Sequence, residues 1–349
     1  MIRLRLHSNQ KSLFRKNLLG WYDINGRSFL PWKVQDIYKI WISEIMLQQT
    51  QVQTVIPYYE RFISKYPTLK SLSTAGLNDI LELWSGLGFY RRAENIYKTV
   101  IKINRDFNGA FPKNYEDILS LPGIGRTTAS AIITFSGYDN RSILDGNVKR
   151  FLSRLSGSEN ESKSTNALWD LSEDLLSNDR AADCIQAYMD IGSLVCRRLK
   201  PSCEECPVNK ICKSYPYETT ETKPSIRTIP QKRNIWAVAI VNHNCDLYLE
   251  KISYDNLWKG LYSSPIFHSK SELLDWVDTT NLKNSLESGV WKFSHNLSHI
   301  KFTFNVMVCN IKYHKKLSLS DDNWYNLSNI DFGIPKYQNK IFNKLKELS

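Results

Sequence analysis

Apolar residues recur at spacings of three and four over the first two thirds of the chain, which is the period of an amphipathic helix. Short segments that contain glycine or proline separate these helical patterns. Two of the sets are Ile37, Ile40, Trp41 and Ile45, and Leu77, Ile80, Leu81 and Trp84. We therefore predict that residues 1–212 form an all-α region.

The pattern changes after Cys212. Residues 213–232 are polar, contain proline and show little periodicity, which predicts an interdomain linker. Beyond it the apolar residues alternate or form short runs. The expected strands lie at 235–241, 247–251 and 299–308, and the expected helices near 271–277 and 337–347. This change of period predicts a separate α+β domain over residues 233–349 and a multidomain chain.

The net charge points to a polyanionic partner. The 349 residues include 46 Lys and Arg against 35 Asp and Glu, which leaves a formal charge of +11. A basic protein of this kind commonly binds nucleic acid, although an AT-rich genome that favours lysine codons would give the same excess. No apolar run approaches the roughly 20 residues that span a bilayer, and the N-terminus lacks the apolar stretch of a signal peptide. We expect a cytoplasmic protein.

Four of the seven cysteines lie in one short segment. Cys196, Cys203, Cys206 and Cys212 have six, two and five residues between them. Zinc sites usually use two short cysteine pairs, whereas only Cys203 and Cys206 form such a pair here. The spacing favours an iron–sulfur cluster and leaves zinc or unligated thiols as alternatives. The odd number of cysteines also argues against a secreted disulfide framework.

Cations surround the cysteine segment. They are Arg197, Arg198, Lys200, Lys210 and Lys213. We expect them to bind phosphate, although a merely solvated basic loop would have the same composition.

Residues 115–135 show the pattern helix, LPGIGR, helix. Gly123 and Gly125 are expected to adopt positive φ in a tight turn and to leave backbone N–H groups unshielded. At the start of the second helix these groups would bind a DNA phosphate without reading sequence. The alternative is an ordinary glycine turn between two helices.

Two carboxylates have contrasting surroundings. Glu44 lies at the border of an apolar helix face, where burial would raise its pKa toward that of a general acid; the alternative is a buried glutamate that only satisfies its neighbours. Asp145 precedes a helix and would stay anionic there, although it or Asn147 could simply be the N-cap. A raised acid beside a persistent anion is the pair that glycosidic cleavage uses.

Five segments together resemble the helix–hairpin–helix DNA glycosylases of the endonuclease III superfamily, and within it the adenine DNA glycosylase (MutY) family. They are SEIMLQQTQ, LWSGLGFYRRAENI, LPGIGRTTASAI, ILDGNVKR and the four-cysteine loop. The resemblance covers essentially the whole chain from residue 27 onward. It implies a six-helix part at about 30–140, a part with a [4Fe-4S] cluster at 1–29 and 141–212, and a DNA cleft between them.

The same resemblance implies the reaction and its residues. The substrate would be adenine mispaired with 8-oxoguanine or guanine in double-stranded DNA, and the protein is expected to act as a monomer. Glu44 would protonate the leaving base, Asp145 would stabilise the cationic sugar, and the four cysteines would bind the cluster. The implied DNA and base contacts are Arg27, Trp32, Leu47, Gln48, Thr50, Phe89, Gly123, Gly125, Thr127, Asn147, Gln186, Ser298 and His299.

Two departures from the family pattern refine this expectation. Thr127 occupies the position where bifunctional relatives have a lysine nucleophile, and a hydroxyl cannot form an imine, so a mainly monofunctional glycosylase is expected. Phe89 occupies the position of the wedge that enters the base stack, where the family commonly has tyrosine. Phenylalanine keeps the stacking face and loses the hydroxyl.

The C-terminal domain resembles the MutT-type (Nudix) fold. No REXXEE string follows residues 256–262, so pyrophosphate hydrolysis is not expected. The family recognises 8-oxoguanine with a Phe-Ser-His turn, which here is Leu297, Ser298 and His299. Leu297 removes the aromatic ring while the two polar residues are kept, and an ordinary Ser-His at a strand end is the alternative.

Two other functions use parts of the same pattern. An endonuclease III-like glycosylase/lyase for oxidised pyrimidines would share the scaffold but lacks its lysine here. A non-catalytic DNA-binding iron–sulfur protein would use the basic surface but leaves Glu44 without a purpose.

Overall fold

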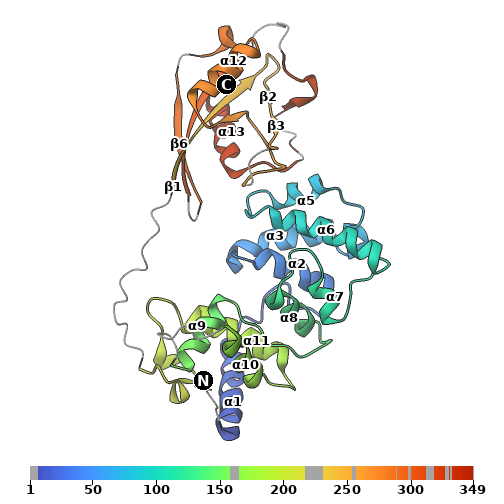
Figure 1. Ribbon diagram of the computed structural model, residues 1–349, viewed down its shortest axis with the longest axis vertical. Coiled ribbons are helices and arrows are strands. Elements are labelled where there is room, and N and C mark those ends of the chain that lie inside the picture. Colours follow the sequence, from blue (N-terminus) through green and yellow to red (C-terminus); the bar gives the residue numbers. More distant parts are fainter. Residues whose placement is uncertain are drawn as a thin grey trace. The chain divides into compact units, whose positions relative to one another are not determined.

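The computed structural model describes residues 7–157, 165–216, 231–253, 257–287, 289–297, 300–311, 318–326, 330 and 332–348 (Figure 1). The chain divides into two compact units. The first comprises Met1–Thr74 and Asn95–Thr222, and the second comprises Ala75–Glu94 and Lys223–Ser349. Most of the predicted linker, residues 217–230, lies outside the described residues, so its boundaries stay a prediction.

The first unit is built from helices, as the spacing of apolar residues predicted. Its early members are α1 (Ser8–Asn25), α2 (Ile37–Leu47), α3 (Val52–Lys65), α4 (Leu69–Leu72), most of α6 (Arg91–Asp106), α7 (Tyr115–Leu119) and α8 (Arg126–Phe135). Then come α9 (Gly146–Leu155), α10 (Thr165–Leu175), α11 (Ala181–Asp190) and a π-helical turn at Ile191–Val195. Two short 3₁₀ turns, Cys203–Glu205 and Asn209–Ile211, complete the cysteine loop.

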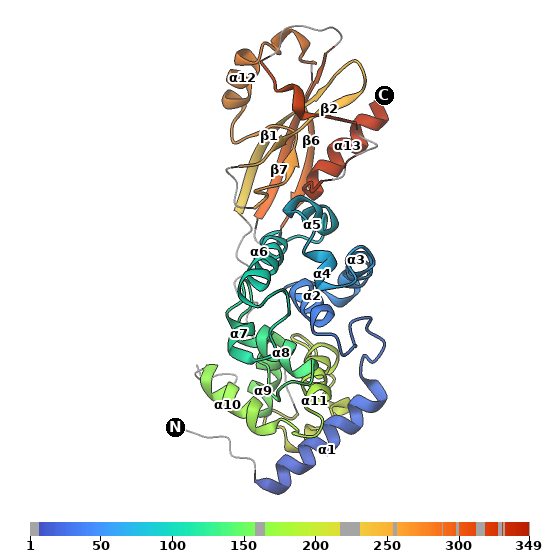
Figure 2. The same cartoon turned by 90° about the vertical axis from the view of Figure 1, so that its right-hand side faces the viewer.

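Local sequence sets where the functional helices begin. The Asp36 carboxylate accepts hydrogen bonds from the Tyr38 and Lys39 amides and so caps α2. Asn114 caps α7 in the same way through the amide of Asp117. Helices α7 and α8, with the LPGIGR turn between them, form the hairpin. Helix α2, which carries Glu44, packs beside α3 and beside α8, the second helix of this hairpin (Figures 1 and 2).

A second helical core joins α1 to the helices after residue 145. Phe14 of α1, Phe151 of α9 and Tyr188 of α11 contact one another with ring centroids 6.1–6.4 Å apart. All three rings are buried, and α1 lies alongside α10 and α11 (Figure 2). This core fixes α9 and α11, which both carry candidate site residues.

The second unit contains a mixed sheet, as predicted for an α+β domain. Its strands are β1 (Gln231–Val241), β2 (Asp246–Tyr248), β5 (Ile266–Phe267), β6 (Trp291–Asn296), β7 (Ile300–Asn310) and β8 (Trp324–Asn326), in the order β6-β7-β1-β2-β8 with β5 beside β1. Strands β1 and β7 run parallel, with Gln231 opposite Ile300 and Val241 opposite Asn310. A separate pair is formed by β3 (Glu250–Lys251) and β4 (Tyr262–Ser263).

Two helices complete the α+β part. Helix α12 (Lys270–Thr279) buries Leu273 and Val277 against Val238 and Ile240 of β1. Helix α13 (Lys336–Leu348) stacks Tyr337 on Phe304 of β7, with ring centroids 4.3 Å apart. The structure therefore confirms the helices expected near 271–277 and 337–347 and extends both of them.

Helix α5 (Leu77–Trp84) and the segment after it belong to the second unit, which the sequence pattern did not predict. The Ser85 and Tyr90 hydroxyls both donate to the Ile334 carbonyl oxygen, at 3.1 and 3.3 Å.

No helix in the described part of the chain is long and apolar enough to cross a membrane.

Candidate active site

Glu44 lies on α2 and lines a pocket of about 350 Å³ in the first unit. The wall also includes Arg27, Leu30, Trp32, Lys33, Val34, Gln35, Ile40, Ser43, Phe135, Asp183 and Gln186. Burial among these groups, with a smaller contribution from the negative charge of Asp145, raises the pKa of Glu44 to about 7. No described residue donates a hydrogen bond to its carboxylate, so Glu44 is suited to hold a proton near neutral pH.

Asp145 caps helix α9, which was the structural alternative for this residue. Its Oδ1 accepts a hydrogen bond from the Val148 amide at 2.7 Å. Its Oδ2 has no hydrogen bond from the described residues, so one oxygen remains available to a ligand. The cap and the chemical role are therefore compatible, because they use different oxygens.

Three residues implied for base recognition line the pocket together. Trp32 is buried and packs edge-on against Tyr59, with ring centroids 5.4 Å apart. Arg27 and Gln186 both bind the carboxylate of Asp190, which lies at the end of α11. The structure thus brings Arg27, Trp32 and Gln186 to the same cavity as Glu44.

The hairpin has the predicted turn, with one correction. Gly123 adopts φ +78°, and a Cβ atom there would lie 2.4 Å from Nδ2 of Asn95, so the position requires glycine. Gly125, for which positive φ was also expected, has φ −98° and is the N-cap of α8. A Cβ atom at Gly125 would meet nothing within 4 Å, so the space next to its backbone is open. The amides of Gly123 and Gly125 donate to no partner among the described residues, which leaves them free to bind an anion.

Residues 47–50 approach this hairpin from the end of α2. Gln48 Nε2 donates to the Gly123 carbonyl and to Thr128 Oγ1, each at 3.3 Å. Thr50 closes the turn by donating from its amide to the Leu47 carbonyl at 3.2 Å. Three residues that the family resemblance implies as DNA or base contacts therefore lie next to the Gly123 turn.

Phe89 is presented on a strained loop of the second unit. It is 49% exposed and adopts φ +50°, a left-handed conformation that is uncommon for a phenylalanine. The Arg92 guanidinium lies 5.3 Å from its ring centroid and 5.4 Å from that of Trp84. Arg92 also donates to the Gly88 carbonyl at 3.0 Å, so it holds both the ring and the backbone of the loop.

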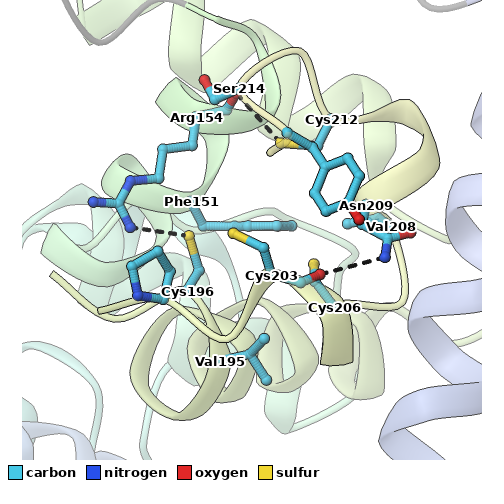
Figure 3. A pocket seen from close by; sticks show the side chains of 12 residues that line it. Phe151, Arg154, Val195, Cys196, Cys203, Cys206, Val208, Asn209, Cys212 and Ser214 are labelled. Carbon is cyan, nitrogen blue, oxygen red and sulfur yellow. Dashed lines mark hydrogen bonds between the residues drawn. The ribbon is translucent and has the colours of Figure 1, made fainter. Parts of the chain in front are cut away.

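The four cysteines surround one cavity, which Figure 3 shows with the Phe151 ring in its wall. Burial raises the pKa of Cys206 to about 12 and raises that of Cys196, where Arg154 opposes the shift. Arg154 Nη1 lies 3.6 Å from Cys196 Sγ and 2.7 Å from the Arg197 carbonyl. Four thiols and a guanidinium around one space fit an anionic, thiolate-ligated centre. Within the described ranges no three His, Cys, Asp or Glu side chains converge as a single-ion site.

Helix α9 also holds the turn that precedes the cysteine loop. Arg150 donates to the carbonyls of Gly192 and Cys196 at 2.5 and 2.9 Å, and to Asn147 Oδ1 at 3.0 Å. A Cβ atom at Gly192 would lie 2.9 Å from the backbone of Asn147. The helix that begins at Asp145 is thus in direct contact with the polypeptide around the first cysteine.

The predicted 8-oxoguanine contacts are not described. Ser298 and His299 lie outside the described residues, while Leu297 donates from its amide to the Ile300 carbonyl at 2.8 Å between β6 and β7. These residues stay predictions.

Sequence reasoning missed Asp190 and the paired roles of Arg150 and Arg154. A signal for Asp190 was present, because a single carboxylate stands between Tyr188 and Ile191 on an otherwise apolar helix face. A charge on such a face needs a buried partner. No local signal identified that partner, since Arg27 is 163 residues away.

Comparison with known proteins agrees with this geometry. Residues 42–174 match the model of the HhH-GPD superfamily base excision DNA repair protein. The adenine DNA glycosylase of Buchnera aphidicola subsp. Acyrthosiphon pisum is 37% identical over 97% of this chain and 99% of its own length. The human adenine DNA glycosylase is 38% identical over 58% of this chain and 39% of its own.

Solved structures show a similar fold for the helical part. A thermostable thymine-DNA glycosylase is similar over 60% of this chain and 97% of its own, with a TM-score of 0.56 and 28% identity. An endonuclease III in a non-covalent DNA complex shares the fold over 60% of this chain and 96% of its own, with a TM-score of 0.52 at 20% identity. Since full-length relatives cover nearly every residue, this chain belongs to the adenine DNA glycosylases, the hydrolases of base excision repair that carry a helix–hairpin–helix domain.

Proposed function

We propose that this protein hydrolyses the N-glycosidic bond of adenine that is mispaired with 8-oxoguanine or guanine in double-stranded DNA. The observation that carries the proposal is the position of Glu44. Its side chain lies in the wall of a 350 Å³ pocket, together with three base-recognition candidates, and its pKa is about 7. Such a pocket accepts a base that has left the stack, which the chemistry requires.

In the proposed mechanism, protonated Glu44 transfers its proton to a ring nitrogen of the extruded adenine. The bond between that base and C1′ then breaks, and positive charge develops on the sugar. The free Oδ2 of Asp145 stabilises this charge electrostatically. Glu44, now a carboxylate, removes a proton from the water that attacks C1′, which leaves free adenine, an abasic site and a reprotonated Glu44.

The protein would release the base without cutting the strand. Thr127 Oγ1 donates to the Leu144 carbonyl at 3.3 Å, so the side chain at the lyase position serves as a structural donor. A hydroxyl offers no amine for a Schiff base.

DNA would be held by the hairpin and entered by the loop of Phe89. The free amides of Gly123 and Gly125 suit a phosphate oxygen, and Leu47, Gln48 and Thr50 follow the same surface. The exposed Phe89 ring suits intercalation, which would open the duplex next to the adenine. We expect Phe89→Tyr to increase the preference for 8-oxoguanine:adenine over other duplexes. An unchanged preference would contradict the wedge assignment.

Cys196, Cys203, Cys206 and Cys212 would bind a [4Fe-4S] cluster. The supporting observations are the shared cavity and the contact of Arg154 with Cys196 Sγ, since a guanidinium stabilises the thiolate form that a cluster needs. When bound, the cluster would supply iron atoms that crosslink the four cysteine thiolates across the loop. The basic residues of the same loop would then contact phosphates. Iron and sulfide analysis tests this assignment against zinc, and a brown preparation is expected.

The C-terminal α+β domain would resemble MutT and recognise 8-oxoguanine through Ser298 and His299. Replacing both by alanine should slow adenine release opposite 8-oxoguanine and leave release opposite guanine nearly unchanged. Equal slowing on both duplexes would argue against the assignment. We further propose that the protein acts as a monomer on cytoplasmic DNA.

The test of the whole proposal uses three duplexes. Adenine is placed opposite 8-oxoguanine, guanine or cytosine, and each duplex is incubated with the protein with and without later alkali. We expect release opposite 8-oxoguanine and guanine alone, with strand cleavage only after alkali. Cleavage of oxidised pyrimidines without alkali would favour the glycosylase/lyase, and binding without base release would favour a non-catalytic DNA-binding protein.

A further inference from the structure

Asp190 is a buried carboxylate that lies outside the proposed chemistry. It is the last residue of α11, its exposed fraction is 0%, and it is absent from the residues that line the pocket. Its Oδ2 accepts the Arg27 amide at 2.8 Å, and its Oδ1 accepts Arg27 Nε at 2.8 Å and Nη2 at 2.6 Å. Oδ1 also accepts Gln186 Nε2 at 2.9 Å. One carboxylate therefore holds two residues of the pocket wall.

This contact determines which end of the Gln186 amide faces the cavity. An ionised carboxylate accepts hydrogen bonds and donates none, so only the NH₂ group of Gln186 can face Asp190. Turning the amide over would place Gln186 Oε1 against Asp190 Oδ1 and would cost a buried hydrogen bond. The described residues supply no donor to Gln186 Oε1. The carbonyl oxygen is therefore the end of the amide that remains for a ligand.

The ion pair with Arg27 makes this arrangement rigid. Arg27 binds Asp190 through its main chain and its guanidinium at once, and it also donates to Ser193 Oγ at 3.3 Å. The carboxylate thus cannot turn without breaking three hydrogen bonds to a charged partner. A fixed acceptor in the pocket favours a base that carries a hydrogen-bond donor, such as the 6-amino group of adenine. It disfavours a purine with oxygen at that position, because two acceptors would meet.

We infer that Asp190 is a positioning residue that makes the pocket selective for 6-aminopurines by fixing the orientation of the Gln186 amide. Asp190 does not touch the base. The inference rests on the proposed excision of adenine and names the device that selects the base.

The test compares two leaving bases opposite 8-oxoguanine under single-turnover conditions: adenine and unsubstituted purine, which lacks the 6-amino group. The readout is the ratio of the two excision rates. Asp190→Leu removes the acceptor, and we expect the ratio to fall about tenfold relative to the unmodified protein. Asp190→Asn keeps one carbonyl oxygen for the donors that meet at Oδ1, so it should retain the ratio within about threefold. Asp139→Asn, which alters an exposed arginine pair with Arg141, is the matched control and should change nothing.

A ratio that stays unchanged in Asp190→Leu while both rates fall together would show a merely structural role and overturn the inference. If Asp190→Leu does not fold because Arg27 loses its partner, the double variant Arg27→Met, Asp190→Leu removes both charges. Gln186→Leu is then added to that double variant and, separately, to the unmodified protein. If Asp190 orients Gln186, Gln186→Leu should lower the ratio of the two excision rates about tenfold in the unmodified protein and hardly at all in the double variant. Equal falls of the ratio in both proteins would overturn the inference.

The activity of the unmodified protein distinguishes a failure of the proposed function from a failure of the positioning role of Asp190. If it releases no adenine from any duplex, the proposed function fails. If it releases adenine and the ratio ignores Asp190, only the positioning role fails.

Discussion

The Thr127 hydroxyl donates to the carbonyl oxygen of Leu144, 3.3 Å away, and so connects the second helix of the hairpin to the residue before Asp145. The element that would bind phosphate and the residue that would stabilise the sugar are thereby joined by one hydrogen bond. Position 127 therefore faces the backbone next to Asp145.

Replacing Thr127 with lysine should create strand-cleaving activity. A lysine amine at this position would reach the sugar and form a Schiff base that borohydride can trap. We expect a covalent protein–DNA adduct after reduction and some cleavage without alkali. Thr127→Met, which has no amine, is the control and should give neither. Failure to trap any adduct with an active lysine variant would argue that position 127 does not face the sugar.

The pH profile of base release should follow Glu44. Its pKa is raised to about 7, and the acid must be protonated to act, so the single-turnover rate should fall as pH rises above about 7. Glu44→Gln should lower the rate at least about 10³-fold and remove this limb of the profile, because the amide has no proton of suitable acidity. An unchanged rate in Glu44→Gln would disprove the assignment of the acid.

The same residue should make stability depend on pH. The folded protein holds the Glu44 proton up to about pH 7, while an unfolded glutamate loses it near 4.5. The folded state binds more protons between these values, so the free energy of unfolding should fall as pH rises from 4.5 to 7. Glu44→Gln should then be more stable than the unmodified protein at pH 8, by roughly 1–3 kcal/mol, and should lose most of that advantage at pH 5. Urea unfolding at both pH values measures the difference.

Substitutions of Asp145 should separate its two tasks. Asp145→Asn keeps an oxygen for the Val148 amide and removes the negative charge, so we expect little loss of stability and a large loss of rate. Asp145→Ala removes the cap as well and should cost about 1 kcal/mol in addition. Thermal melting and single-turnover rates report the two effects. Equal stability of both variants would mean that the cap contributes nothing.

The two hairpin glycines should respond differently to alanine. Gly123→Ala combines φ +78° with a Cβ atom 2.4 Å from Asn95, so we expect a loss of about 1–3 kcal/mol and weaker DNA binding. Gly125→Ala has φ −98° and open space, so its stability should change by less than about 0.5 kcal/mol. Melting temperatures and affinity for abasic-site duplex check both. Similar losses at the two sites would contradict this account of the turn.

Local patterns predicted the elements of this protein because they depend on neighbours in sequence. The period of apolar residues marked α2 and α9, and the short strand-like run at 235–241 marked β1. The N-cap interpretation of Asp145 and its chemical interpretation both followed from one residue before a helix. Gly125 was misjudged because the pattern GIG does not reveal which glycine needs the left-handed conformation.

Distant partners could not be predicted in the same way. The parallel pairing of β1 with β7 joins residues about 70 positions apart, and Gln48 meets Gly123 across 75 positions. The Arg27–Asp190 ion pair joins residues from opposite ends of the helical region. Such pairs depend on how whole helices and strands pack against one another. The spacing of apolar residues in a single sequence does not indicate which distant residues will meet.

Much of the pocket wall comes from residues 26–36, a stretch between α1 and α2 with no helix or strand of its own. It supplies Arg27, Leu30, Trp32, Lys33, Val34 and Gln35, while Glu44 lies on helix α2, which follows. An irregular segment tolerates insertions and exchanges that a helix would not. Substitutions in this one short connection are therefore expected to change the preference for a base while Glu44 and helix α2 stay as they are.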